Sequence, residues 1–265
     1  MLALGPRGPP RKPYFYRPMN HLTEQNTIRI GETDAHHRLT VPALTERLQD
    51  IAWEHSVTRA VDVPRLLEQG VSWVLSRMRI DVTRWPTYRE AVALMTWVAD
   101  IARYSYYRPF RLTDAETGDV LIRATSVWGV LDMEKRRVVP IPAFIRSKTA
   151  VFDGPEALPP ASGKLPPPDE VQYAESFTAR WYDLDANGHV NNTRYFQWLL
   201  DALPDSFLDS HTLQTLDVVF RGEAMLGQPV VSEAAQPEPL AFAHRIRTDD
   251  GRELVQARSV WVSSP

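Results

Sequence analysis

The densest group of polar side chains in the chain is one short run, 183–192 (DLDANGHVNN). It stands directly before a predicted helix, where Asn191 or Asn192 would cap the first turn and Gly188 would permit a tight turn. Unpaired backbone N–H groups and the positive end of the helix dipole favour negative charge at such a place, including that on a carbonyl oxygen under attack. Because capping needs only one such residue, we interpret the run as a candidate oxyanion site.

The chain has no cysteine, which excludes a cysteine nucleophile, thiolate metal sites and disulfides. It also lacks the Gly-x-Ser-x-Gly run that exposes a serine nucleophile. Carboxylates and His189 remain as groups that could activate water or attack an acyl carbon. A thioester suits such groups because a thiolate leaves easily. Glu223 follows a predicted strand in the run FRGEA, although taken alone it would more often be a solvated turn residue.

Two segments of mixed strand and helix lie on either side of a Pro-rich stretch, 155–168 (PEALPPASGKLPPP). They share a strand-like match between 118–128 (GDVLIRATSVW) and 251–261 (GRELVQARSVW), identical at Gly, Leu, Ala, Ser, Val and Trp. Internal similarity of this kind predicts a duplicated architecture. We therefore expect a first half at 13–150, a linker at 151–170 and a second half at 171–263.

Each half is predicted to contain a strand, then one principal helix, then several strands. The helices are 44–57 and 192–203, both with apolar residues at helical spacing. A long helix wrapped by an antiparallel sheet is the simplest way to bury both apolar faces. This predicts an α+β fold of two tandem hotdog halves joined into one continuous sheet. The predicted strands are 26–31, 71–82, 91–100 and 120–131 in the first half, and 171–180, 213–221, 229–233, 242–247 and 254–262 in the second.

The composition is that of an ordinary globular chain: 265 residues, 43% hydrophobic and 24% charged. The formal net charge of -3 argues against nucleic-acid binding. No apolar stretch approaches the roughly 20 residues needed to cross a bilayer, and 1–17 lacks the apolar block of a signal peptide. We expect a cytoplasmic protein without a membrane span. His36 and His37 could suggest a metal, but adjacent histidines point in different directions and no third ligand is found, so neither a metal nor a cofactor is predicted.

The run 181–200 (WYDLDANGHVNNTRYFQWLL) resembles the acyl-ACP thioesterases, whose second hotdog half carries a D-x-N-x-H-V-N-N motif at the start of its helix. In the first half, 73–97 and 117–142 also look like that family, and the resemblance covers residues 13–262. It implies a thioesterase, a thioester hydrolase of lipid metabolism, that releases free fatty acid in fatty acid biosynthesis. The partner would be an acyl carrier protein carrying a phosphopantetheine-linked fatty acyl chain.

On this resemblance the catalytic Asp, Asn and His fall on Asp185, Asn187 and His189, and a downstream Glu falls on Glu223. Plant members have Cys after that Glu where this chain has Ala224, which rules out a Cys–His mechanism here. In the preferred assignment Glu223 is the base, Asn187 and His189 position substrate, water or carboxylate, and Asp185 orients its neighbours. Whether Glu223 or Asp185 attacks stays open. The oxyanion would be held by the backbone of Val190, Asn191 and Asn192.

In the family the first half mainly shapes the acyl-chain tunnel. Laying 33–40 (TDAHHRLT) over 182–189 places Asp34 on Asp183 and Thr40 on His189, so that the Asp-Asn-His set is lost from the first half. Because the acyl carrier is a small acidic protein, we expect a basic docking patch near the tunnel mouth. The candidates by position are Arg136, Arg137, Arg146, Lys148 and Arg194.

Two other functions remain open from the sequence: an acyl-CoA thioesterase, and a hotdog protein that binds acyl chains without catalysis. A sensor of the second kind would need a DNA-binding segment, and no basic helix-turn-helix pattern precedes Asn26. A hotdog dehydratase is conceivable, but its His and acid would have to act on a β-hydroxy group. A homodimer is also left open.

Overall fold

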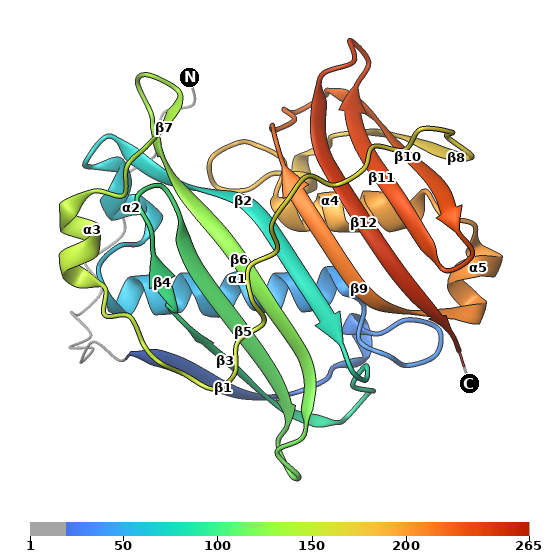
Figure 1. Ribbon diagram of the computed structural model, residues 1–265, viewed down its shortest axis with the longest axis horizontal. Coiled ribbons are helices and arrows are strands. Elements are labelled where there is room, and N and C mark those ends of the chain that lie inside the picture. Colours follow the sequence, from blue (N-terminus) through green and yellow to red (C-terminus); the bar gives the residue numbers. More distant parts are fainter. Residues whose placement is uncertain (1–19, 265) are drawn as a thin grey trace.

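The computed structural model describes residues 20–264, which form one sheet of twelve strands with two long helices, α1 and α4, on one face (Figure 1). The strands follow the order β1-β3-β5-β6-β2-β9-β12-β11-β10-β8, with β4 beside β5 and β7 beside β6. The first half contains β1 (His21–Thr27), α1 (Val41–Thr58), α2 (Val63–Leu67), β2 (Val71–Val82), β3 (Ala91–Trp97), β4 (Asp100–Ile101), β5 (Tyr106–Asp114), β6 (Val120–Asp132), β7 (Arg137–Val139) and α3 (Ala143–Lys148). The second contains β8 (Tyr173–Thr178), α4 (Asn192–Asp201), α5 (Asp205–Ser210), β9 (His211–Phe220), β10 (Pro229–Glu238), β11 (Ala241–Thr248) and β12 (Glu253–Ser263).

Each long helix begins at a side-chain cap and buries one face. The Thr40 hydroxyl accepts the Ala43 N–H at 3.3 Å at the start of α1, and Asn191 Oδ1 accepts the Thr193 N–H at 3.1 Å at the start of α4. Burying a large apolar side chain stabilises the fold by roughly 1.5–3 kcal/mol. The helices therefore owe most of their stability to the sheet beneath them. The buried apolar residues of α1 and α4 include Leu44, Leu48, Ile51, Tyr195, Phe196 and Leu199.

The two halves join where β2 pairs with β9, in a register that sets Ile80 opposite Leu216. Across this joint the Arg77 guanidinium donates to both oxygens of Asp217, at 2.8 and 2.7 Å. A planar fork of this kind fixes the register as well as adding energy. The predicted continuous sheet of two hotdog halves is thus confirmed.

The repeat predicted from the sequence lies on equivalent strands, β6 and β12. The glycines before them, Gly118 and Gly251, both have positive φ, at 79° and 86°. In each strand the tryptophan indole N–H donates to the serine hydroxyl two residues earlier, Trp128 to Ser126 and Trp261 to Ser259, both at 2.8 Å. The matching Gly, Ser and Trp residues therefore form the same turn and the same side-chain hydrogen bond in both halves.

Several local predictions differ from the structure. The strand expected at 26–31 is wrong, because β1 ends at Thr27 and residues Ile30–Glu32 form a 3-10 turn that redirects the chain toward α1. Strand β5 and the short elements α2, α3, α5, β4 and β7 were not predicted. Residues 149–172 contain neither helix nor strand, and Figure 1 shows them crossing in front of the sheet while α1 lies behind it. Within residues 20–264 no helix is both long and apolar enough to span a membrane.

Candidate active site

The loop before α4 is shaped by the carboxylate of Asp185. Its Oδ1 accepts the N–H groups of Asn187 at 2.8 Å and His189 at 3.3 Å, and its Oδ2 accepts from Asn187 Nδ2 at 3.3 Å. Gly188, with φ of 80°, allows the chain to turn back so that the Asp185 N–H reaches the His189 carbonyl at 2.8 Å. The three polar residues predicted in this loop are therefore held as one unit.

Glu223 reaches this loop from the segment between β9 and β10. Its Oε2 lies 3.2 Å from Nδ1 of His189. Backbone contacts hold the two segments together: Val190 donates to the Ala224 carbonyl at 3.0 Å, and His189 and Met225 form a bridge. The His189 and Glu223 side chains are 19% and 38% exposed, so the pair is sheltered but open to a substrate.

Tyr195 supports the glutamate segment from inside the protein, a role the sequence did not suggest. Its hydroxyl accepts the Ala224 N–H at 2.7 Å, one residue after Glu223. Burial raises the pKa of Tyr195 to about 12, so the hydroxyl stays neutral. The sequence did carry a signal for this role. Tyr195 falls on the apolar face of a predicted helix, where a buried hydroxyl needs a hydrogen-bond partner.

Arginines surround Glu223 on its exposed side. Arg136 Nη2 lies 3.7 Å from Glu223 Oε2, and Arg252 Nη2 donates to the Glu223 carbonyl at 3.2 Å. Arg136 belongs to the turn between β6 and β7 in the first half, whereas Arg252 precedes β12 in the second. Both halves therefore contribute positive charge at the mouth of the site.

Of the three backbone N–H groups predicted to hold an oxyanion, two are already engaged. Val190 donates to the Ala224 carbonyl at 3.0 Å and Asn191 to the Asp183 carbonyl at 2.8 Å. The prediction is wrong for these two groups, because acceptors from outside the loop take their protons. The Asn192 N–H has no hydrogen-bond partner among the described residues and lies at the positive end of α4.

Two small cavities, of about 10 and 70 Å³, lie along α1 and have Gln49 and Trp128 in both of their walls. We call them together the α1 cavities. The smaller is lined by Asn192 and Thr193, and the larger by residues that include Arg108. The walls of the α1 cavities are Thr45, Leu48, Gln49, Ala52, Trp53, Ser56, Asp62, Val63, Trp73, Leu75, Met78, Tyr106, Arg108, Phe110, Trp128, Asn192, Thr193 and Phe196.

The five predicted docking residues have different neighbours in the structure. Arg136 lies beside Glu223, and Arg137 is exposed on β7. Arg194, on α4, lies 3.6 Å from Asp183. Arg146 donates to the carbonyls of neighbouring loop residues, including Ile101 at 2.9 Å, and Lys148 to the Ala60 carbonyl at 3.2 Å. These last two side chains are exposed and also hold the chain around α3 together.

The loop before α1 is the counterpart of the loop before α4, but in a different alignment from the one predicted. Asp34 Oδ1 accepts the N–H groups of His36 and Arg38 at 2.8 and 2.9 Å, as Asp185 does for Asn187 and His189. Placing Asp34 on Asp183 and Thr40 on His189 is therefore wrong by two residues. Asp34 corresponds to Asp185, and an Asp-His-Arg set stands in place of Asp-Asn-His.

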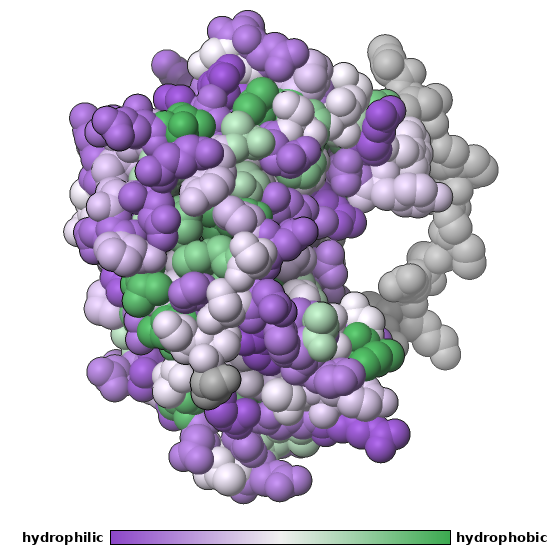
Figure 2. All heavy atoms as spheres, turned by 90° about the vertical axis from the view of Figure 1, so that its right-hand side faces the viewer, coloured by the Kyte–Doolittle hydropathy of each residue, from purple (hydrophilic) through white to green (hydrophobic). Residues whose placement is uncertain are grey.

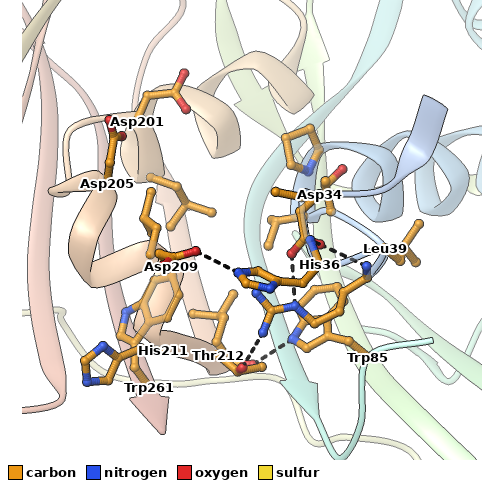
Figure 3. Close-up of a pocket in the computed structure, with 18 of the residues that line it drawn as sticks. Asp34, His36, Leu39, Trp85, Asp201, Asp205, Asp209, His211, Thr212 and Trp261 are labelled. Atoms are coloured by element: carbon orange, nitrogen blue, oxygen red, sulfur yellow. Dashed lines mark hydrogen bonds and ion pairs between the residues drawn. The ribbon is translucent and has the colours of Figure 1, made fainter. Parts of the chain in front are cut away.

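In this counterpart site Trp85 takes the place of Glu223, since Leu39 donates to the carbonyl of Pro86 just as Val190 does to that of Ala224. Its polar side chains bind the second half. Figure 3 shows His36 directed at Asp209, with Nε2 and Oδ1 at 2.8 Å, and the Trp85 indole donates to the Leu213 carbonyl at 3.0 Å. A cavity of about 840 Å³, larger than the two α1 cavities, lies here.

Residues 20–148 match the model of the acyl-ACP thioesterase N-terminal domain, and residues 167–263 match that of the C-terminal domain. The chain is 29% identical over 252 residues to the palmitoyl-acyl carrier protein thioesterase, chloroplastic, of Cuphea hookeriana, a match covering 89% of this chain and 60% of that protein. The chain thus spans about three fifths of the length of this curated relative.

Two solved structures are similar over nearly their whole length. The 12:0-ACP thioesterase from Umbellularia californica has a TM-score of 0.85 at 23% identity, covering 93% of this chain and 98% of that one. An acyl-ACP thioesterase from Bacteroides thetaiotaomicron has a TM-score of 0.82 at 22% identity, covering 92% and 98%. These likenesses show that the double hotdog fold is shared.

Proposed function

Because the chain belongs to the acyl-ACP thioesterase family, we propose that it hydrolyses the thioester of fatty acyl-ACP, releasing free fatty acid and ending chain elongation. The observation that carries the proposal is the 3.2 Å approach of His189 Nδ1 to Glu223 Oε2. This pair stands beside the start of α4, whose first residues, Asn192 and Thr193, line the smaller of the two α1 cavities. A thioester carbon can therefore lie between a base and a donor while its acyl chain enters the first half.

In the proposed reaction Glu223 is the base. Its carboxylate takes a proton from water as the water oxygen bonds to the acyl carbon. The carbonyl oxygen gains negative charge, which the Asn192 N–H and the α4 dipole stabilise. The carbon–sulfur bond then breaks, and the proton passes from Glu223 to the departing thiolate. His189 holds the Glu223 carboxylate in place for both transfers.

The hydrogen bonds favour Glu223 over Asp185 as the base. The oxygens of Asp185 accept from two backbone amides and one side-chain amide of its own loop. In Glu223, Oε2 lies 3.2 Å from His189 Nδ1 and 3.7 Å from Arg136 Nη2, whereas Oε1 accepts no hydrogen bond from the described residues and is available to a water molecule. Asp185 is thus a positioning residue, and Asn187 remains beside the site to orient water or substrate.

The proposal assigns acyl-chain binding to the first half (13–150), catalysis to the second (171–263) and the connection to 151–170. Arg136 and Arg137 would receive the acidic acyl carrier protein, since both lie on the turn and strand next to Glu223. Such charges speed encounter more than they tighten binding. The proposal also includes a cytoplasmic location. The oligomeric state, monomer or homodimer, is to be measured by sedimentation.

The test is to incubate the purified protein with a ladder of acyl-ACPs and to quantify the acids released, in parallel with acyl-CoAs of the same chains. Higher kcat/KM on the ACP thioesters supports the proposal. Equal or higher kcat/KM on the CoA thioesters would favour an acyl-CoA thioesterase instead. Tight binding of acyl-ACP without release of acid would favour the alternative of a hotdog protein that binds acyl chains without catalysis.

A further inference from the structure

Four large apolar side chains are exposed beside the candidate active site. They belong to Trp181 and Tyr182, in the 3-10 turn that precedes the polar loop, and to Met225 and Leu226, in the segment between β9 and β10. Their exposed fractions are 63%, 88%, 49% and 53% in that order. Apolar side chains scattered singly over a surface are ordinary, whereas a contiguous group marks an interaction site. We call these four residues the apolar patch.

Backbone contacts hold the two parts of the apolar patch side by side, next to His189. Met225 forms a bridge with His189. In the turn that follows Met225, the Gly227 N–H donates to the Ala179 carbonyl at 2.9 Å. Trp181 comes two residues after Ala179, so the turn of Met225 lies against the turn of Trp181. The apolar patch therefore flanks the place where the thioester is proposed to react.

The duplicated fold supplies an internal comparison for the first part of the apolar patch. The 3-10 turns that begin at Ile30 and Trp181 are equivalent, because the last carboxylate of each accepts the backbone N–H three residues earlier at 2.7 Å. Ile30, 58% exposed, thus stands where the second half has Trp181. Gly31 stands where the second half has Tyr182, so the most exposed side chain of the apolar patch has no counterpart.

The second part of the apolar patch has an equivalent as well. Thr87 forms a backbone bridge to the loop before α1, as Met225 does to the loop before α4. Tyr88, the next residue, therefore corresponds to Leu226 and is 39% exposed. At these four positions the first half exposes two large apolar side chains and the second half exposes four. Because the two loops share their backbone hydrogen bonds, folding does not require the additional apolar side chains of the second half.

The residue types of the apolar patch favour a protein partner. Trp, Tyr, Met and Arg are enriched in protein–protein interfaces, and Trp, Tyr and Arg are the residues whose truncation most often weakens binding. Side chains that are about half or more exposed project from the surface, so they suit a partner that covers them. A small interface of this kind is typical of a transient complex, as a partner that leaves after each turnover requires.

The charges around the apolar patch indicate that this partner is acidic. Arg180 directly precedes Trp181, is exposed, and within residues 20–264 has no ion-pair partner. Arg136 adds a second exposed guanidinium at the same site. The nearby carboxylates already have partners, since Asp183 accepts the Arg180 N–H at 2.7 Å and Asp185 accepts N–H groups of its own loop. The positive charges are therefore left to a partner.

We propose that the apolar patch is a docking surface for the body of the acidic acyl carrier protein, which covers it while the thioester lies at Glu223. The inference rests on the proposed hydrolysis of acyl-ACP and adds apolar contacts to the positive charges already assigned to the carrier. The charges steer the carrier to the site, and the apolar side chains hold it there during turnover. Its occupant is the protein and not the acyl chain, because the four side chains stand on the outer surface.

The experiment separates contact with the carrier from contact with the reacting thioester. One acyl group, dodecanoyl, is presented on ACP, on CoA and on N-acetylcysteamine, a thiol that lacks the protein and most of the phosphopantetheine arm. We expect the double variant Trp181→Ala/Tyr182→Ala to lower kcat/KM on the ACP thioester at least about tenfold, mainly through KM, as loss of an interface hot spot would give. The kcat/KM on the CoA and N-acetylcysteamine thioesters should stay near the wild-type values.

Ile30→Ala is the matched control, since it truncates the exposed residue of the equivalent turn. It should leave kcat/KM on all three thioesters unchanged, and thermal unfolding verifies that the variants are folded. Tyr182→Ala alone, at a position 88% exposed, tests the proposal if the double variant is unstable. It should lower kcat/KM on the ACP thioester only.

The pattern of losses decides among the alternatives. Equal losses on all three thioesters would assign the apolar patch to the reacting site, and losses shared by ACP and CoA would assign it to the phosphopantetheine arm. An unchanged kcat/KM on the ACP thioester would show that the carrier does not touch the apolar patch. Each of these results overturns the inference and leaves the proposed hydrolysis intact. Absence of turnover by the wild-type protein on every thioester overturns both.

Discussion

Asp185 and Glu223 are both carboxylates of the site, but their neighbours give them different roles. The polar loop could be predicted from the sequence because its hydrogen bonds are local, joining residues two and four positions apart. The occupied amides of Val190 and Asn191 could not, since their acceptors depend on how distant segments fold. The same holds for the burial of Arg108, which appears only when β5 is placed so that this side chain reaches His55 of α1.

Replacing Asp185 by Ala should reduce hydrolysis strongly, because it removes the acceptor of the Asn187 and His189 amides. We expect kcat/KM to fall at least about tenfold and stability to fall by about 1 kcal/mol, the usual net contribution of such hydrogen bonds at a half-buried position. Asp34→Ala in the equivalent loop is the matched control. It should cost similar stability in urea unfolding while the rate stays near that of the wild type. Equal losses of activity in both variants would mean that Asp185 acts only through folding.

His244 gives the fold a pH dependence of its own. Full burial lowers its pKa from 6.5 to about 4, so protonation favours the unfolded chain. Its stabilising contribution is complete above pH 6.5 and is lost as the pH falls toward 4, amounting to about 3 kcal/mol. His244→Gln should therefore show a shallower loss of unfolding free energy between pH 7 and 4 than the wild type. Parallel curves for the two proteins would refute this contribution.

At the scale of elements, long periodic segments were predictable and irregular ones were not. Strand β2 begins and ends at the predicted residues, because apolar and polar residues alternate along its second part, where Met78, Ile80 and Val82 are buried. Strand β5 was missed, since Arg108, Pro109 and Arg111 interrupt its apolar run. Pairing with β6 and β3 overrides that weak local preference.

The caps of the two long helices offer a paired test. Asn191→Ala and Thr40→Ala should each lower stability by about 1 kcal/mol, the usual cost of losing a side-chain cap. Only Asn191→Ala should also lower kcat/KM, because α4 begins beside His189 and α1 begins at the counterpart site. Denaturant unfolding and steady-state rates measure the two effects separately. Loss of activity in Thr40→Ala alone would contradict the assignment of catalysis to the second half.

The whole molecule is a duplication in which one of two equivalent loops keeps the Asp-Asn-His set. The internal repeat made the double hotdog predictable from the sequence. The correct alignment of the two loops became visible only from the backbone hydrogen bonds of the structure. The side seen in Figure 2, to the right of Figure 1, is mostly hydrophilic with smaller hydrophobic groups between. The halves are held in register chiefly by the β2–β9 joint, where Arg77 and Asp217 are only 12% and 14% exposed.

Breaking that joint should destabilise the protein as a unit. Asp217→Ala leaves the Arg77 charge sheltered and unpaired, and we expect a loss of about 3 kcal/mol in unfolding free energy. The nearby pair Arg79–Asp81 is more exposed, at 36% and 31%, so Asp81→Ala should cost less than about 1 kcal/mol. Urea unfolding of both variants makes the comparison. Similar losses in the two would show that the joint does not depend on the Arg77–Asp217 fork.

The central claim is that Glu223, held by His189, is the base that activates water. The most direct measurement is the kcat/KM of Glu223→Gln on dodecanoyl-ACP, since glutamine keeps the shape of the side chain and removes its basicity. Glu253→Gln, a change in a carboxylate that pairs with Arg221, serves as the control. The account predicts a fall of about a hundredfold or more in Glu223→Gln, with an unchanged melting temperature and a near wild-type control. Wild-type turnover by folded Glu223→Gln would contradict it.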